Sequence, residues 1–84
     1  MNIEKQHQLK MLRILVKTEI MKHGFTNQKS LAHHLDISEG MLSECVNFKL
    51  DAQDRLKGSA EVWRDMEKIF DIDIMNKLIA LGLR

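Results

Sequence analysis

The stretch QKSLAHHLDISEGMLSECVN, residues 28–47, decides the fold, because its apolar residues recur at helical spacing on both sides of a short polar break. Leu31 and Leu35 stand four residues apart before the break. The apolar positions after it are Leu42, Cys45 and Val46. Residues three or four apart share one face of a helix, so each half has a single apolar face. The pattern predicts two short helices that turn these faces toward a common core.

The break between the two helices carries the residues that a tight crossing requires. Ala32 supplies a small side chain where the two backbones approach, and Ile37 fills the turn. One residue of such a turn adopts a positive φ; here it is Asp36, whose short polar side chain tolerates the left-handed region. Ser38 is a good N-cap for the second helix. The stretch therefore predicts a helix-turn-helix.

A longer helix precedes this motif. Residues 4–23 keep one helical period, and Gly24 follows as a C-terminal stop. The inward positions are Leu9, Leu12, Val16 and Ile20. A second set widens the apolar stripe: Met11, Ile14, Leu15 and Met21. We therefore expect this helix to pack on two sides. Thr26 or Asn27 then caps the first helix of the motif, which ends at Leu35.

Two more helices follow the motif after a polar connection. Residues 48–58 are polar and weakly periodic, which predicts a loop with one short helical turn at residues 52–56. Ser59 is the expected N-cap of a fourth helix over residues 60–71. Its inward face comprises Val62, Trp63, Met66, Ile69 and Phe70. Asp73 is the expected cap of a fifth helix, which Gly82 ends.

The composition agrees with one compact all-α domain over residues 1–84, because the chain has no proline and its glycines fall between the periodic stretches. The 13 Lys and Arg nearly balance the 12 Asp and Glu, so the chain lacks the basic excess of many nucleic-acid-binding proteins. Its one cysteine excludes an internal disulfide, and its N-terminus is too charged for a signal peptide. No apolar run approaches the roughly 20 residues that span a bilayer. We expect a cytoplasmic protein.

The motif resembles that of the lambda-repressor-like family, the Cro and CI type of phage and prophage regulators. The residues that carry the resemblance are Gln28, Leu31, Ala32, Leu35, Ile37, Ser38, Leu42 and Ser43. It covers residues 12–47 well and the helices after Ser59 more loosely. Asp36 in place of a turn glycine and the long connection 48–58 depart from the family pattern. The resemblance implies an all-α, compact five-helix domain with a central helix-turn-helix.

In this family the second helix of the motif lies in the major groove, with its N-terminal residues toward the base edges. The corresponding outward face here comprises Ser38, Glu39, Gly40, Ser43, Glu44 and Asn47. Asn47 could pair bidentately with adenine, and a glutamate accepts a hydrogen bond from the cytosine amino group. Gln28 is similar to the residue that binds a backbone phosphate in this family.

The predicted reading helix has the wrong charge for phosphate, because residues 30–48 hold three acids and no Lys or Arg. Affinity for DNA comes mainly from cations that displace counterions at phosphates, so the attraction must come from the flanks. The expected phosphate contacts are Gln28, Lys29, Lys49, Arg55 and Lys57. The same charge pattern leaves a second interpretation open. In it, the motif binds another protein, as an antirepressor or co-regulator of a transcription factor would.

Other chemistry has little support in the sequence. His33 and His34 are adjacent and point to different sides of a helix, and no HxxxH or CxxC spacing occurs. Cys45 falls on the inward face, where it fits as a small core residue. No serine can be assigned a base and an orienting acid. We therefore expect neither an enzyme nor a site for a metal or other cofactor.

The last helix is apolar around most of its circumference, which predicts a dimer interface on it. The expected interface residues are Ile74, Met75, Leu78, Ile79, Leu81 and Leu83. A two-fold dimer would hold two reading helices about one turn of DNA apart. The alternative is that the first helix covers this face within the same chain. The sequence thus predicts a repressor, of a phage or mobile element, that binds double-stranded operator DNA as a homodimer.

Overall fold

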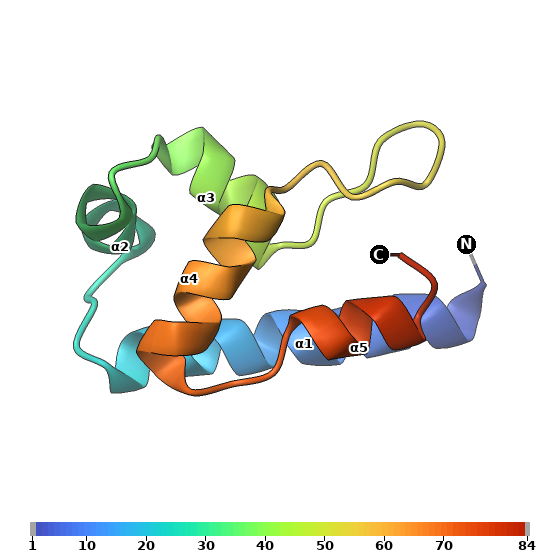
Figure 1. Ribbon diagram of the computed structural model, residues 1–84, viewed down its shortest axis with the longest axis horizontal. Coiled ribbons are helices and arrows are strands. Elements are labelled where there is room, and N and C mark those ends of the chain that lie inside the picture. Colours follow the sequence, from blue (N-terminus) through green and yellow to red (C-terminus); the bar gives the residue numbers. More distant parts are fainter. Residues whose placement is uncertain (1, 84) are drawn as a thin grey trace.

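The computed structural model describes residues 2–83, which form five helices and no strand. The helices are α1 (Ile3–Lys22), α2 (Gln28–Leu35), α3 (Glu39–Val46), α4 (Ala60–Phe70) and α5 (Met75–Ala80). In Figure 1, α1 and α5 lie side by side along the base, α4 stands across them, and α2 and α3 lie above. The prediction of an all-α, five-helix domain is confirmed.

Polar caps and glycines set the helix ends close to the predicted places. Asn27 caps α2 and Ser38 caps α3, each by accepting a hydrogen bond from the amide three residues on, at 2.9 and 3.0 Å. Gly24 and Gly82, which follow α1 and α5, have φ angles of 85° and 74°. Ser59 precedes α4 as predicted, although its side chain makes no capping hydrogen bond.

The core is centred on Trp63, which is fully buried. Its ring stacks on Phe48 with the centroids 5.8 Å apart, and its indole N–H donates to the Cys45 carbonyl at 3.0 Å. Most predicted inward positions are buried around it: Leu9, Leu12, Val16, Ile20, Leu31, Leu42, Cys45, Val46, Val62, Met66 and Phe70. Leu35, Ile37 and Ile69 are half-buried at the margin. Periodicity therefore identified the faces that α1 to α4 turn inward.

Gly58 brings the chain close to both α3 and α4. A Cβ atom at this position would lie 2.7 Å from Trp63 Cζ2 and 3.0 Å from Cys45 Sγ, closer than side chains pack. The next amide, that of Ser59, donates to Cys45 Sγ at 3.4 Å. Cys45 has no exposed surface, which confirms its predicted place in the core, and this burial raises the pKa of its thiol.

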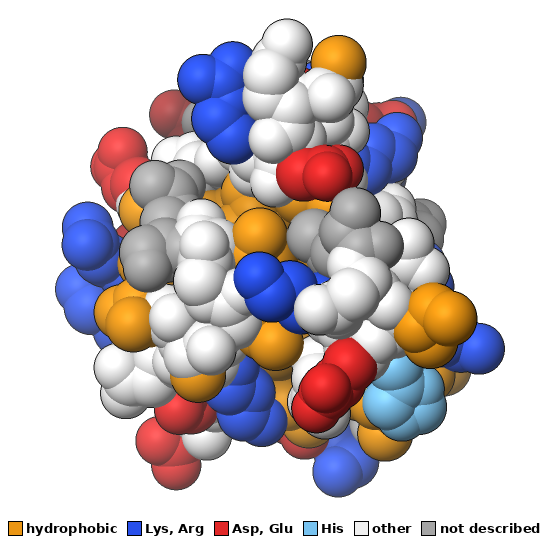
Figure 2. Space-filling view, turned by 90° about the vertical axis from the view of Figure 1, so that its right-hand side faces the viewer, with side chains coloured by type: hydrophobic (Ala, Val, Ile, Leu, Met, Phe, Trp, Pro, Cys, Tyr) orange, Lys and Arg blue, Asp and Glu red, His pale blue; other side chains and the backbone are white. Residues whose placement is uncertain are grey.

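The predicted helical turn at residues 52–56 is wrong: residues 49–57 form a hairpin loop, with Leu50 and Leu56 paired in antiparallel fashion. The Lys57 amide donates to the Lys49 carbonyl at 2.9 Å. A left-handed residue, Asp54 with φ of 59°, prevents a helical turn here. Figure 2 shows hydrophobic side chains exposed in a hollow near the middle of this face of the molecule.

The expectation that α1 packs on two sides is also wrong, because its second apolar set faces away from the core. Met11, Ile14 and Met21 are 51%, 49% and 77% exposed, and only Leu15 of that set is half-buried against the core. The core of an 84-residue domain is too small to cover both sides of a twenty-residue helix. None of the five described helices has the length and hydropathy that a membrane span requires.

The start of α5 depends on a residue that the sequence did not single out. Glu67 of α4 accepts hydrogen bonds from the Ile74 and Met75 amides through one carboxylate oxygen, at 2.8 and 2.9 Å. Asp73, the predicted cap, accepts one from the Asn76 amide at 3.2 Å. Two carboxylates from different elements therefore satisfy the first amides of this six-residue helix.

Candidate nucleic-acid interface

The crossing of α2 and α3 has the predicted residues in the predicted roles. Asp36 ends α2 in the left-handed region, with φ 57° and ψ 46°. The Ile37 amide donates back to the Ala32 carbonyl at 3.0 Å, which closes the turn. Leu31 is fully buried and Ala32 is 2% exposed, so no larger side chain fits between the helices at that point. The geometry directs the start of α3 outward.

The first turn of α3 is open to solvent. Ser38, Glu39 and Gly40 are exposed, whereas Leu42, Cys45 and Val46 on the opposite side have no exposed surface. Hydroxyl and carboxylate groups at this turn are able to meet base edges. These three residues form the accessible part of the predicted base-reading face.

The two expected base readers further along α3 are engaged with each other. The Asn47 side-chain amide donates to the Ser43 carbonyl at 3.0 Å and to the Ser43 hydroxyl at 3.3 Å, and both residues are half-buried. Asn47 is the C-cap of α3, so its amide group satisfies the end of its own helix. A bidentate bond from Asn47 to adenine would have to break these two hydrogen bonds. In the free protein its N–H donors are not presented to a groove.

Glu44, the third half-buried residue of this face, is paired with the hairpin loop. Its carboxylate lies 3.2 Å from the ammonium of Lys57, and the two side chains are 28% and 49% exposed. The ion pair removes part of the negative charge of α3 and, by the same contact, occupies a predicted phosphate ligand. From the sequence, the Glu44 charge was expected to repel phosphate and the Lys57 charge to attract it, with no contact expected between the two side chains.

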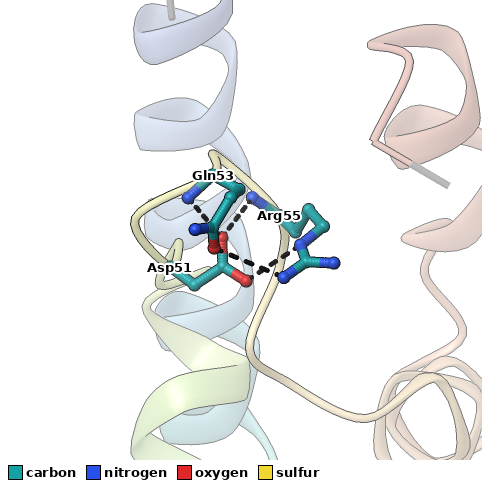
Figure 3. A network of polar contacts seen from close by, with 3 residues as sticks. All are labelled: Asp51, Gln53 and Arg55. Atoms are coloured by element: carbon teal, nitrogen blue, oxygen red, sulfur yellow. Dashed lines mark hydrogen bonds and ion pairs between the residues drawn. The ribbon is translucent and has the colours of Figure 1, made fainter.

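Arg55, another predicted phosphate ligand, is held inside the hairpin loop (Figure 3). Its Nε donates to Asp51 Oδ2 at 3.1 Å, and its guanidinium reaches the side chain of Gln53. Asp51 Oδ1 also accepts from the backbone amides of Gln53 and Arg55, each at 2.9 Å. The bond from the Arg55 amide is the main cause that lowers the pKa of Asp51. Arg55 therefore stabilises the turn of the loop.

The remaining predicted phosphate ligands flank α3 on two sides. Gln28 and Lys29 open α2, where Gln28 is half-buried and Lys29 is exposed. Lys49 follows α3 and is exposed. The first backbone amides of a helix also attract anions, so the start of α2 combines a cation with helix N–H groups. Of the five predicted phosphate contacts, the two in the hairpin loop pair with carboxylates, one of the loop and one of α3, and three remain at the flanks.

The predicted dimer interface on α5 needs a correction. Ile74 and Leu78 have no exposed surface, because they pack into the core of the same chain. Met75, Leu81 and Leu83 are half-buried, and Ile79 is 55% exposed. A groove of about 560 Å³ separates α1 from α5; Leu12, Leu15, Ala80 and Leu81 are among its lining residues. Part of the apolar surface that was assigned to a partner is thus buried within the same chain.

No group of three or more His, Cys, Asp or Glu side chains among residues 2–83 is arranged to hold a metal ion. His33 and His34 are exposed. The ring of His34 meets that of Phe25 edge-on, with the centroids 5.5 Å apart. These histidines therefore lie on the surface of α2 as aromatic and polar groups.

Several contacts that were not predicted join residues of different elements. Lys57 is thirteen residues from Glu44, and Glu67 is seven from Ile74. In each pair the two residues lie on different elements, so the periodicity of one helix or strand does not predict the contact. The Asp51 turn had a local signal, because an aspartate two residues before a bonded amide is typical of such turns.

Comparison of the chain with family models, with curated proteins and with solved structures finds no match.

Proposed function

We propose that the chain is a sequence-specific DNA-binding regulator of transcription, a repressor of the phage type, that inserts α3 into the major groove. The observation that carries the proposal is the exposed turn from Ser38 to Gly40, which begins a helix whose other side is fully buried. In a helix-turn-helix protein the first residues of the second helix read base edges, while neighbouring groups bind phosphates. Gln28, Lys29 and Lys49 supply those neighbouring groups.

The test starts from a binding site selected out of random double-stranded DNA. Lys29→Ala should weaken binding to all sequences alike and reduce the salt dependence by about one charge. Asn47→Ala should cost about 1 to 3 kcal/mol at the selected site only, if its amide leaves Ser43 to reach a base. Failure to select any site would count against the proposal, and two variants without effect would exclude this orientation of α3.

A two-fold homodimer on DNA belongs to the same proposal, with a smaller interface than the sequence suggested. Ile79 is its exposed centre, and Met75, Leu81 and Leu83 lie half-buried around it. Ile79→Asp should weaken operator binding and leave the fold intact, because the side chain already faces solvent. The measurement is sedimentation of the protein with and without operator DNA.

Binding of another protein is a second candidate function, and one observation favours it. Lys57 pairs with Glu44 and Arg55 with Asp51, so two of the cations expected to bind phosphate are already neutralised by carboxylates. Replacing Glu39 and Glu44 with Gln distinguishes the two functions. A rise in non-specific DNA affinity supports the insertion of α3 into the major groove of DNA, because the two substitutions remove charges that repel phosphate. Unchanged DNA binding together with loss of a purified protein partner supports the second candidate.

A further inference from the structure

The exposed side of α1 carries an apolar stripe with one basic edge. Ile3, Met11, Ile14 and Met21 are 84%, 51%, 49% and 77% exposed, and they supply four of the five large apolar side chains that residues 2–83 expose. At 100° per residue they lie on the side opposite to the buried residues Leu12 and Val16. We call these four residues the outer stripe. Exposed apolar surface of this kind marks a contact with another molecule.

Two lysines edge the outer stripe. Lys10 and Lys17 are exposed, and each stands four residues from a stripe residue, Ile14 or Met21. Glu19, by contrast, is only 15% exposed and pairs with Lys22 at 3.6 Å and with the ring of His23. The outer stripe therefore presents apolar groups beside positive charge along one edge, while Glu4 is exposed at the start of the other edge.

A groove elsewhere on the molecule has the complementary character. It lies between the α2–α3 turn and the first half of α4 and has a volume of about 400 Å³. Its lining residues are Leu35, Asp36, Ile37, Met41, Ser59, Glu61, Val62 and Asp65. We call this the acidic groove, because the described residues that line it include three carboxylates and no Lys or Arg.

The carboxylates of the acidic groove repel one another. Glu61 and Asp65 are four residues apart on α4, a spacing at which like charges destabilise a helix, and Asp36 faces the same groove. Among residues 2–83, no ion pair that the structure records involves any of these three. A partner that brings positive charge relieves this repulsion, and apolar side chains on that partner cover the apolar lining.

We propose that the outer stripe of one copy docks in the acidic groove of a second copy. Lys10 and Lys17 then face the three carboxylates, while Met11 and Ile14 cover the apolar lining. Symmetrical pairing of two outer stripes is disfavoured, because it would bring the lysines of both copies together. The net charge of +1 adds almost no general repulsion between copies.

The contact joins two different surfaces, so it is heterologous. Such a contact extends head to tail and does not stop at two copies unless the rotation closes a ring. The average mass should rise with protein concentration, and salt should reduce it because the charged groups lie at the surface. The contact does not depend on DNA binding and is measured without DNA.

Charge reversal on each surface tests the proposal by sedimentation. Lys10→Glu with Lys17→Glu should weaken self-association about 100-fold or more, since like charges at an interface cost several kcal/mol. Glu61→Lys with Asp65→Lys should do the same. A mixture of the two double variants should associate again, because each altered surface meets the opposite charge on the other variant. Lys49→Glu is the control for a lysine reversal away from both surfaces, because Lys49 is exposed and belongs neither to α1 nor to the lining of the acidic groove.

Three results would overturn the proposal. The first is a monomer at all concentrations up to about 1 mM, where contacts worth about 4 kcal/mol become visible. The second is an association that Ile79→Asp abolishes and the charge reversals leave intact, which would assign it to α5. The third is failure of the mixture to associate while circular dichroism shows both variants folded. Binding of the monomeric chain to phosphatidylserine vesicles through Lys10 and Lys17 would instead assign the outer stripe to lipid.

Discussion

The two sides of α3 differ in what holds them in place. On the inner side Leu42, Cys45 and Val46 have no exposed surface, and the Trp63 indole donates to the Cys45 carbonyl. The outer side has an exposed first turn and, further along, polar groups paired within 3.3 Å of a neighbour. In this helix of eight residues, the inner side therefore contributes to stability and the outer side is available for binding. Changes on its two sides should have effects of different size and kind.

The largest expected effect comes from removing the centre of the inner side. Trp63→Ala should lower the free energy of unfolding by about 3–5 kcal/mol, because it leaves a large cavity and deprives the Cys45 carbonyl of its donor. Glu39→Ala, on the outer side, should change stability by less than about 0.5 kcal/mol. Urea denaturation of both variants measures the contrast. Equal losses would remove the distinction between the two sides.

The same substitution at two glycines, one buried and one exposed, tests the difference between the two sides of α3. Gly58→Ala should destabilise the domain by about 1–3 kcal/mol, because the added methyl group would lie 2.7 Å from the Trp63 ring. Gly40→Ala should stabilise it by about 0.4–1 kcal/mol, since the nearest atom is 4.0 Å away and the unfolded chain loses freedom. Thermal melts should move in opposite directions. A shift of the same sign would contradict the packing around Gly58.

The ion pair on the outer side should contribute less. Glu44→Gln should lower the free energy of unfolding by at most about 1 kcal/mol, because both partners are partly exposed and water screens their attraction. Lys57→Met should have a similar effect, and the two losses should not add in the double variant. Additive losses would show that the two side chains do not interact in solution.

The smallest effect should be a pH dependence in the hairpin loop. Hydrogen bonds, first from the Arg55 amide, lower the pKa of Asp51 in the folded state. The carboxylate therefore stabilises the folded loop above the ordinary pKa of aspartate, and this contribution disappears as pH falls through the lowered value. An NMR titration of the Asp51 carboxyl carbon should give a midpoint below the ordinary value. A midpoint at or above it would exclude the contacts of Figure 3 in solution.

The inner side of the motif was predictable because its signals are local. Leu31, Ala32 and Leu42 recur at helical spacing, and Asp36 is one of the few residues that tolerate the left-handed turn. The caps Asn27 and Ser38 follow from the same short-range chemistry. Five helices and most of the buried faces could therefore be predicted from the sequence alone.

The outer side was less predictable, since its state depends on a loop without periodicity. Lys57 reaches Glu44 only because the hairpin loop folds back, and Asn47 turns to its own helix because α3 ends there. The apolar excess of α1 was visible in the sequence, but periodicity says how wide a stripe is and not whether a neighbour covers it. Ile74 and Leu78 show the reverse error, an apolar pair assigned to a partner that packs into its own domain.

The place of Trp63 also determines how this domain can be observed. It is the only tryptophan, and the chain has no tyrosine, so nearly all ultraviolet fluorescence comes from the point where α3, the hairpin loop and α4 meet. The ring is fully buried and stacked on Phe48, so its emission should be shifted to the blue in the folded protein. Any motion of α3 against α4 alters the surroundings of this one fluorophore. The intrinsic fluorescence of Trp63 can therefore follow changes at α3, the helix that is proposed to bind DNA, without an added label.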